Sequence, residues 1–295
     1  MTRRDPIRRF CLPGGRRGVF LAGAPPAVRE YLPDPAARLG EAGSRIKKKG
    51  SRSLTLAPEG FLVKHFYPRN PWRTILHTFL RAPAANAFAN HRHLVALGFP
   101  APRPFAAVVV RRPFPLYRES FFLLERIPGV ANLRDELLAR SDLYASADPR
   151  RLAPFRAAAD LVARFHRLGY FHQDLNAKNV LLEPRPSGEI HYHLIDFDGS
   201  LRLGWLPKLA FQILRFTDLR RFLSSLRYWV RRTDRERFLA AYFARFPDSR
   251  RERRLFQVFL RVTDFLTGHA DKMRRRDRKA ALTIEFEREN AAKGE

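Results

Sequence analysis

The spacing of four polar residues in the middle of the chain restricts its possible folds more than any other feature of the sequence. His172, Asp174 and Asn179 have the spacing His-x-Asp-x4-Asn, and Asp196 follows 17 residues after Asn179 at the end of a short apolar run. A helical pattern precedes these residues, and a turn rich in Pro and Gly at 184–188 separates two strand-like segments. The order is therefore a helix, a loop and two strands, with the polar side chains at the ends of these elements.

Phosphoryl transfer explains why these residue types occur together. It requires a carboxylate that orients the attacking hydroxyl and accepts its proton, which Asp174 can do. It also requires oxygen ligands for Mg²⁺ beside the nucleotide phosphates, which Asn179 and Asp196 can supply. Each residue alone would more often cap a turn or bond its own backbone. Their joint spacing matches the catalytic and metal-binding loops of kinases.

A lysine upstream of these motifs fits the same chemistry. Lys64 is the only Lys or Arg in the strand-like apolar run 61–66, and a kinase needs such a lysine to hold the α- and β-phosphates. The alternative is an edge strand that carries a lysine to prevent aggregation. The basic stretch 47–53 occupies the place of the phosphate-covering loop, but it lacks G-x-G-x-x-G and fits a solvated charge run equally well.

The first part of the chain is expected to be a basic extension followed by a small sheet. Residues 1–37 are rich in Arg, Pro and Gly, so we expect an irregular extension with little core. The apolar patterns after it predict a β-hairpin at 53–66, a helix at 84–97, and strands at 105–110 and 120–124. These elements would form a small sheet with one main helix.

The second part of the chain, from residue 129 on, is expected to be helical. Apolar residues recur at helical spacing from 155 to 168, and Gly169 ends that helix. The later stretches 205–232 and 250–279 place Arg and Lys beside Phe, Leu and Trp. They could dock on anionic lipid, or they could be core helices with solvated arginine faces.

The excess of basic residues points to an anionic partner. Lys and Arg number 56 against 29 Asp and Glu, which gives a formal net charge of +27. Nucleic acid, a membrane surface or a phosphorylated glycolipid would each match that sign of charge. The sequence contains no zinc, helix-turn-helix or RNA-recognition motif, so we do not expect nucleic acid to be the partner.

Cysteine content and hydropathy indicate the compartment. Cys11 is the single cysteine, which excludes an intramolecular disulfide framework and fits a reducing compartment. We find neither a secretory signal pattern nor a window of about 18 uncharged apolar residues. We therefore expect a cytoplasmic protein whose association with a membrane is peripheral.

The segment from about Lys48 to Leu226 resembles the bacterial lipopolysaccharide core kinases. This protein-kinase-like family phosphorylates sugar hydroxyls of the inner core. The motifs at 171–179 and 194–198 are most similar to the Kdo kinase pattern. The stretch 98–104 also resembles the segment that follows the single N-lobe helix of the family.

The resemblance implies an α+β, two-lobed, protein-kinase-like fold. A small β-rich N-lobe with one main helix would occupy 38–128, and a larger helical C-lobe would occupy 129–295. The resemblance also implies ATP and Mg²⁺ as cofactors, with Lys64, Glu125 and Lys178 as ATP-binding residues and Glu125 near the hinge. The acceptor would be Kdo or heptose of lipopolysaccharide, or another anionic glycolipid, at the cytoplasmic face of the inner membrane.

Departures from the usual kinase pattern leave a second function open. No Asp or Glu lies between Gly60 and Arg118, so the helix glutamate that usually pairs with the strand lysine is missing. Asn86 or Asn90 could hydrogen-bond in its place, but a neutral amide cannot form an ion pair. The sequence therefore fits an ATP-dependent sugar kinase, or alternatively a catalytically weak pseudokinase that acts as a scaffold on an anionic membrane.

The metal-binding tripeptide also differs from that of protein kinases. Asp-Phe-Gly is replaced by Asp-Phe-Asp at 196–198, with Gly199 following, a form found in sugar and antibiotic kinases. An Ala-Pro-Glu string occurs at 57–59, upstream of Lys64, and none follows Asp196. The activation segment of protein kinases ends in that string, so its absence there argues against a protein substrate.

Overall fold

The chain forms two compact units. The structure is a computed structural model that describes residues 5–42, 44–49, 51–68, 70–79, 81–112, 116–139, 153–226 and 230–267. We call Met1–Leu133, Leu168–Asp174 and Lys178–Gly204 the sheet unit, and Arg134–Arg167, Leu175–Ala177 and Trp205–Glu295 the helical unit. These units do not coincide with the lobes expected at 38–128 and 129–295, because most of residues 168–204 belong to the sheet unit.

Seven of the described strands of the sheet unit build one antiparallel sheet. Its order is β1 (Ile7–Leu12), β2 (Arg16–Leu21), β6 (Pro104–Arg111), β7 (Tyr117–Leu124), β5 (Leu62–Phe66), β4 (Arg52–Leu56) and β3 (Ser44–Lys49). The hairpin predicted at 53–66 is confirmed as β4 and β5. The strands predicted at 105–110 and 120–124 are confirmed as β6 and β7.

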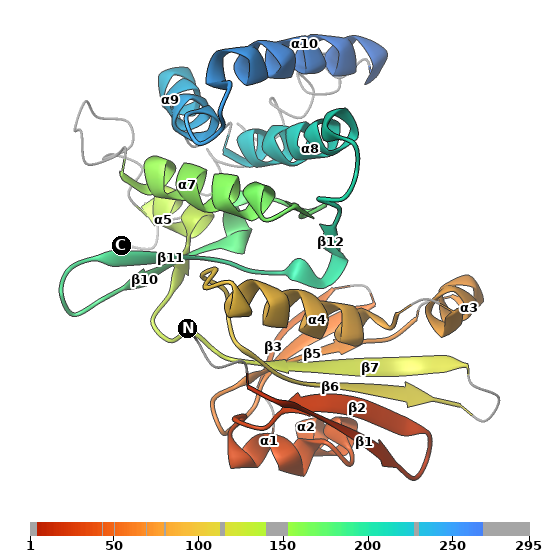
Figure 1. Cartoon of the computed structure of the whole chain (residues 1–295). Coiled ribbons are helices and arrows are strands. Elements are labelled where there is room, and N and C mark those ends of the chain that lie inside the picture. The colour runs from red at the N-terminus through yellow and green to blue at the C-terminus, as the bar shows by residue number, and fades with distance from the viewer. Residues whose placement is uncertain are drawn as a thin grey trace, which may run out of the picture. The chain divides into compact units, whose positions relative to one another are not determined.

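Helices bury both faces of this sheet. The described helices of the unit are α1 (Pro26–Tyr31), α2 (Pro35–Ala42), α3 (Pro71–Phe79) and α4 (Pro83–Ala96). Along β7, Phe121 and Leu123 join the core on the α1 face, whereas Phe122 and Leu124 join the core on the α4 face. Successive side chains of a strand point to opposite faces, so the continuous apolar run at 121–124 fits between two helical layers (Figure 1).

The sequence pattern explains why α4 forms where it does. Pro83 occupies the first turn, where its missing N–H costs nothing, and the helix ends before Gly98, whose φ is 68°. Its buried residues recur at helical spacing from Ala84 to Leu94. The helix predicted at 84–97 is therefore confirmed, and it is the longest described helix of the sheet unit.

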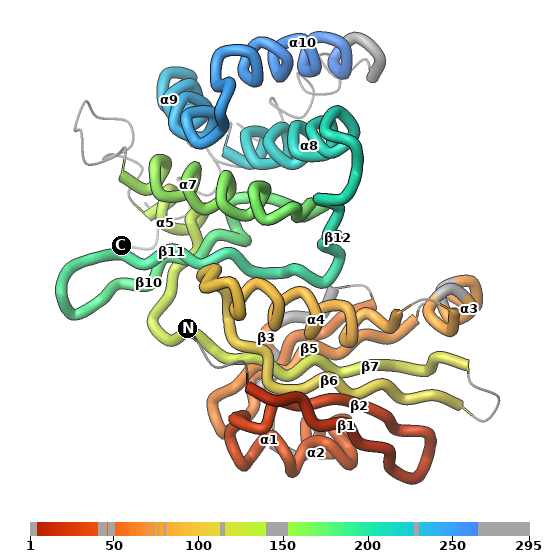
Figure 2. The backbone as a smooth tube through the Cα atoms, in the orientation of Figure 1, coloured from red at the N-terminus to blue at the C-terminus, as the bar shows by residue number. Residues whose placement is uncertain are grey.

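The prediction of an irregular extension at 1–37 is wrong. Strands β1 and β2 pair with each other, and β2 pairs with β6, so the segment extends the sheet (Figure 2). Val28 and Tyr31 of α1 are almost completely buried in the core. The glycines and prolines that suggested irregular structure instead make the turn at Gly14–Gly15, with φ of 72° and 71°, and the start of α1.

The remaining strands of the sheet unit carry the motif segment. β8 (Ala131–Asn132), β10 (Val180–Pro184) and β11 (Ile190–Leu194) form one small sheet, and β9 (Tyr170–Phe171) pairs with β12 (Leu201–Arg202). The short 3-10 helix η2 (Ala177–Asn179) precedes β10, and η3 (Phe197–Gly199) follows β11.

The described helices of the helical unit are α5 (Leu133–Ala139), α7 (Ala153–Arg167), α8 (Lys208–Leu226), α9 (Arg232–Phe243) and α10 (Ser249–Thr267), with Leu133 itself in the sheet unit. The helix predicted at 155–168 is confirmed as α7, and Gly169 follows it with a φ of 80°. His166 of α7 lies 2.8 Å from the Tyr242 hydroxyl of α9 in the core.

The basic stretch 250–279 lies within the described residues only as far as 267. No helix in the described part of the chain is both long enough and apolar enough to cross a membrane.

We expect Val28→Ala to lower the free energy of unfolding by about 2 kcal/mol, because it leaves a cavity in the core between α1 and the sheet. Arg17 is exposed on β2, so Arg17→Ala should change the same quantity by about 0.5 kcal/mol or less. Chemical denaturation of the full chain measures both. Wild-type stability of the Val28→Ala variant would mean that residues 26–31 do not belong to the core.

Candidate active site

The segment after β9 forms a loop whose polar side chains are held by its own backbone and by the strand that follows. The Asn179 amide nitrogen donates to the carbonyl oxygen of Asp174 at 2.8 Å, and His172 Nε2 donates to the carbonyl oxygen of Ile195 at 3.0 Å. The side chain of Asp174 is exposed, whereas Asn179 is buried. The loop therefore presents a carboxylate to solvent on a fixed backbone.

The β10–β11 hairpin brings the two predicted metal ligands together. Val180 is opposite Leu194 in the register of these strands. Ile195, which directly follows β11, donates its N–H to the carbonyl oxygen of Asn179 at 3.0 Å. Asn179 and Asp196 thus lie at the same end of the hairpin. Because the Asn179 amide nitrogen is already bonded to Asp174, the amide oxygen is the atom that could coordinate a metal.

Two residues of this region have a left-handed backbone. Gln173 and Asp196 have φ of 71° and 70°, and they are the only non-glycine residues with positive φ in the described ranges. Side chains other than glycine rarely adopt this conformation, and such strain occurs often at functional sites. One of these residues directly precedes Asp174, and the other is the predicted metal ligand itself.

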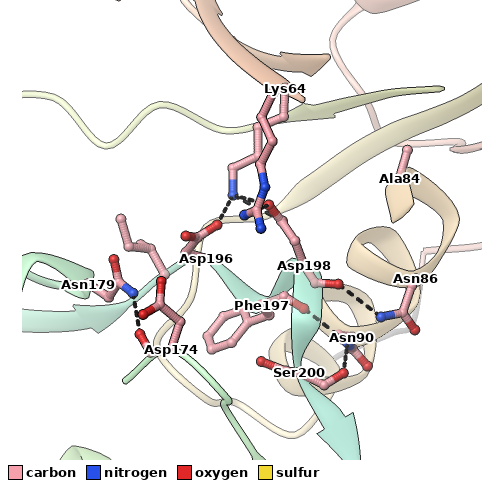
Figure 3. A network of polar contacts seen from close by, with 12 residues as sticks. Lys64, Ala84, Asn86, Asn90, Asp174, Asn179, Asp196, Phe197, Asp198 and Ser200 are labelled. Atoms are coloured by element: carbon pink, nitrogen blue, oxygen red, sulfur yellow. Dashed lines mark hydrogen bonds and ion pairs between the residues drawn. The ribbon is translucent and has the colours of Figure 1, made fainter. Parts of the chain in front are cut away.

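Lys64 lies at the centre of β5, and its ammonium group reaches both carboxylates of the Asp-Phe-Asp tripeptide. The Nζ atom is 2.8 Å from Asp196 and 3.0 Å from Asp198 (Figure 3). The strand position predicted for Lys64 is confirmed. β5 lies between β4 and β7, so Lys64 is not on an edge strand. The alternative, a lysine that protects an edge strand from aggregation, therefore does not apply.

Asp198 is the site residue that the sequence analysis missed. Its side chain is only 5% exposed, and besides Lys64 it faces Arg52 at 3.6 Å. The distribution of acidic residues along the sequence could have identified Asp198. With no Asp or Glu between Gly60 and Arg118, the strand lysine needs a carboxylate from elsewhere, and the tripeptide offers a second one.

The two asparagines of α4 have a different role from the one considered for them. Asn86 donates to the carbonyl oxygen of Asp198 at 3.1 Å. Asn90 donates to the carbonyl oxygens of Phe197 at 3.1 Å and Ser200 at 2.8 Å. Both amides therefore hold the backbone of the turn that carries Asp196 and Asp198 (Figure 3). Lys64 itself is bonded to the carboxylates of Asp196 and Asp198.

Aromatic contacts also hold Phe197, the central residue of the tripeptide. The Phe197 ring is almost fully buried, and it lies 4.8 Å from His91 of α4 and 5.6 Å from His172, measured between ring centroids. Burial and the neighbouring Lys64 charge lower the pKa of His91 to about 3. The His91 ring is therefore neutral at physiological pH, and its Nδ1 donates to the carbonyl oxygen of Pro102 at 3.0 Å.

The ion cluster fixes the charge state of its members. Burial opposes the charge of Lys64, but Asp196 and Asp198 outweigh it and hold the pKa of Lys64 well above its usual value. The Lys64 charge holds the pKa of Asp196 far below its usual range, so this carboxylate stays ionised. Burial raises the pKa of Asp198 to about 6; Lys64 opposes this shift, and the Asp196 carboxylate adds to it.

The other predicted residues lie at the edges of this arrangement. The Glu125 carboxylate accepts a hydrogen bond from the backbone N–H of Arg103 at 2.9 Å, just after the end of β7. Lys178 is exposed in η2. The basic stretch 47–53 spans the end of β3 and the start of β4, and its Arg52 is the residue that faces Asp198. The ATP-binding roles expected for Glu125 and Lys178 remain predictions.

The oxygen atoms at this site suit Mg²⁺ held together with a nucleotide. In the described ranges, no group of three or more His, Cys, Asp or Glu side chains could hold a metal ion. Mg²⁺ in phosphoryl-transfer enzymes needs only one or two protein oxygens, because substrate phosphates and water complete its coordination. Asp196, which stays ionised, and the Asn179 amide oxygen provide that number.

Comparison with known proteins agrees with this chemistry. The model of the lipopolysaccharide kinase (Kdo/WaaP) family matches residues 46–242. A 3-deoxy-D-manno-octulosonic acid kinase of Stenotrophomonas maltophilia (strain R551-3) is 35% identical over 196 residues, which cover 64% of this chain and 68% of that protein. The enzyme of the same name from Xanthomonas oryzae pv. oryzae (strain PXO99A) is 36% identical over 137 residues, covering 46% and 48% respectively.

A solved structure shows the same fold. The structure of WaaP in complex with acyl carrier protein matches with a TM-score of 0.57 and 23% identity, covering 82% of this chain and 97% of that chain. The α+β, protein-kinase-like fold implied by the sequence resemblance is thereby confirmed. Since the family model spans most of the chain and contains every motif residue described above, the chain belongs to the Kdo/WaaP lipopolysaccharide kinase family, whose members transfer phosphate to a sugar hydroxyl.

Proposed function

We propose that this kinase uses ATP and Mg²⁺ to phosphorylate a hydroxyl of Kdo in the inner core of lipopolysaccharide. The observation that carries the proposal is the 2.8 Å ion pair between Lys64 and Asp196, at the end of the hairpin that also positions Asn179. The relatives named 3-deoxy-D-manno-octulosonic acid kinase favour Kdo over heptose as the acceptor sugar.

In this proposal, Asp174 is the general base. It accepts the proton of the acceptor hydroxyl as the hydroxyl oxygen bonds to the γ-phosphorus and the bond to the bridging oxygen of the leaving ADP breaks. The bond from Asn179 to its carbonyl holds the Asp174 backbone in place. Exposure of the Asp174 side chain suits a base that must meet a bulky acceptor.

Asp196 and Asn179 would hold Mg²⁺ through their oxygens. The metal, when bound, neutralises charge that develops on the phosphate oxygens. Asp196 would exchange its contact with Lys64 for the metal, and Lys64 would then turn toward the α- and β-phosphates. Asp198 would keep its 3.0 Å contact with Lys64, so the lysine would remain ionised and oriented throughout.

The ion pair between Lys64 and Asp198 favours an active kinase over a pseudokinase scaffold. The reason for considering a scaffold was the missing helix glutamate, since an unpaired strand lysine would be poorly positioned. Asp198 offers Lys64 a carboxylate at the distance expected of an ion pair. A buried carboxylate supplied by a turn can orient the lysine as well as one supplied by a helix.

We also propose that the enzyme works as a peripheral protein at the cytoplasmic face of the inner membrane. Its acceptor would be anchored there by lipid. The net charge of +27 would attract the protein to an anionic leaflet, at about 1 kcal/mol for each Lys or Arg close to the surface. The acceptor itself is an anionic glycolipid and would be attracted by the same charge.

Mass spectrometry of the acceptor tests the proposed reaction. The purified full chain, incubated with ATP and Mg²⁺, should add one phosphate to the Kdo residue of a Kdo–lipid A acceptor. Asp174→Asn should keep nucleotide binding but lower the turnover rate by about 100-fold to 10,000-fold, because the amide cannot accept the proton. Glu189→Gln, at an exposed carboxylate of the β10–β11 hairpin, serves as the control and should have wild-type turnover.

Two results would contradict the proposal in different ways. Phosphate found on heptose of an extended acceptor, with none on Kdo, would exclude Kdo as the substrate and leave the family activity intact. Nucleotide binding without phosphate on either sugar would favour the scaffold.

A second prediction concerns Asp198. Asp198→Asn should lower kcat/KM for ATP on the order of 100-fold, because the neutral amide no longer orients the Lys64 ammonium. Asp160→Asn is the matched control, since Asp160 also forms an ion pair, 2.6 Å from Arg245, on exposed α7 surface. The melting temperature of each variant is recorded to exclude unfolding. Wild-type kinetics of a folded Asp198→Asn variant would mean that Lys64 does not need this carboxylate.

A further inference from the structure

Helix α3 carries an apolar ridge that its own unit leaves exposed. Trp72, Ile75 and Phe79 occur at positions i, i+3 and i+7, so they lie on one face of the helix. Their exposed fractions are 76%, 42% and 84%. Within the described residues, neither core cluster of the sheet unit includes these side chains, and the proposed reaction does not use them. A soluble chain rarely exposes Trp and Phe to this extent without a function.

The last turn of α3 is fastened to the sheet. Thr78 accepts a hydrogen bond from the Tyr117 N–H at 2.9 Å through its hydroxyl oxygen, and its carbonyl oxygen accepts one from Arg111 at 3.3 Å. The rings of His77 and Tyr117 are 5.3 Å apart. Figure 1 shows α3 beside the end of β7 at which that strand begins. The helix is therefore held against the sheet while the three side chains of the ridge remain exposed.

The surroundings of the ridge are basic. Arg81 follows the helix, and Arg112 lies at the end of β6 near the half-exposed Leu116; both arginines are exposed. From residue 61 to 118 the sequence has nine Lys or Arg and no Asp or Glu. The first carboxylate along the chain after this range is Glu119. It is bonded to His65 at 2.8 Å and faces Arg118 at 3.4 Å.

We propose that α3 docks the enzyme on an anionic membrane, with Trp72, Ile75 and Phe79 inserted at the level of the lipid headgroups. A short helix with an aromatic and aliphatic face and basic flanks binds such an interface through apolar burial and attraction to anionic lipid. Tryptophan is favoured at this depth because its ring is partly polar. This inference deepens the proposed peripheral association and rests on it for the lipid anchor of the acceptor.

The position of α3 leaves the catalytic residues accessible. Tyr117, which α3 contacts, is five residues along β7 from Phe122, the partner of Lys64 in the strand register. At 3.3 Å per residue, the point at which α3 contacts β7 is about 17 Å along the strand from the register position of Lys64. The inserted side chains would therefore not occupy the site at Lys64, while a lipid-anchored sugar would stay within reach.

Vesicle binding by the full chain tests the inference. Sedimentation with vesicles of phosphatidylglycerol and phosphatidylethanolamine should give a partition coefficient about tenfold lower for Trp72→Ser/Phe79→Ser than for the wild type. The matched control is Leu209→Ser/Ile213→Ser, which removes two apolar side chains of α8 that are 66% and 47% exposed. This control should bind like the wild type. Binding should also decrease in high salt and on vesicles of neutral phosphatidylcholine.

Fluorescence adds a measurement that depends on insertion itself. Emission from Trp72 should shift to shorter wavelength on the anionic vesicles, and Trp72→Phe should lose this shift while it still binds. Equal binding by Trp72→Ser/Phe79→Ser and the wild type would overturn the inference, as would an equal loss in the α8 control. A dimer that only Trp72→Ser/Phe79→Ser abolishes, without vesicle binding, would assign the ridge to a second copy of the chain and also overturn it.

The phosphorylation assay separates this inference from the proposed function. Trp72→Ser/Phe79→Ser should phosphorylate a soluble, delipidated acceptor at the wild-type rate, because the contacts described for α3 are with Tyr117 and Arg111 and not with the residues proposed for catalysis. Wild-type protein that binds the vesicles through α3 but phosphorylates neither acceptor would refute the proposed function and support the docking surface.

Discussion

The contact of one buried lysine with two carboxylates determines the arrangement of the site. Lys64 is charged, and its two partners are the first and last residues of the tripeptide at 196–198. Removing a cation from water is costly unless charged partners surround it. The chain meets this requirement by bringing the end of β11 to the centre of β5. The β10–β11 hairpin, which also places Asn179, and the two α4 asparagines hold that turn beside Lys64.

The supply of a carboxylate by the turn instead of by a helix changes the role of α4. A helix glutamate would link α4 to the lysine directly and make the ion pair depend on the position of the helix. Here α4 contributes neutral amides that bind the carbonyl oxygens of Phe197, Asp198 and Ser200. The helix therefore holds the turn, and the turn holds the lysine. No Asp or Glu lies between Gly60 and Arg118, so α4 itself has no carboxylate to offer the lysine.

Sequence spacing predicted the parts of the site that local structure controls. Asn179 and Asp196 end up together because the two strands between them form a hairpin, and the apolar pattern around Lys64 is that of a strand. Asp198 was missed because its role depends on a contact with β5, which lies 134 residues away along the chain. The strands in residues 1–37 were missed for a similar reason. The pairing of β2 with β6 is a long-range contact, and the glycines and prolines of the segment suggested irregular structure when considered alone.

A double-mutant cycle for Lys64 and Asp198 tests the central claim most directly. The four proteins are the wild type, Lys64→Met, Asp198→Asn and the double variant, each compared by kcat/KM for ATP. If Asp198 acts through Lys64, the double variant should be no less active than Lys64→Met, so the two losses will be strongly non-additive. Losses that multiply in the double variant would show that the two residues act independently, and would contradict the account.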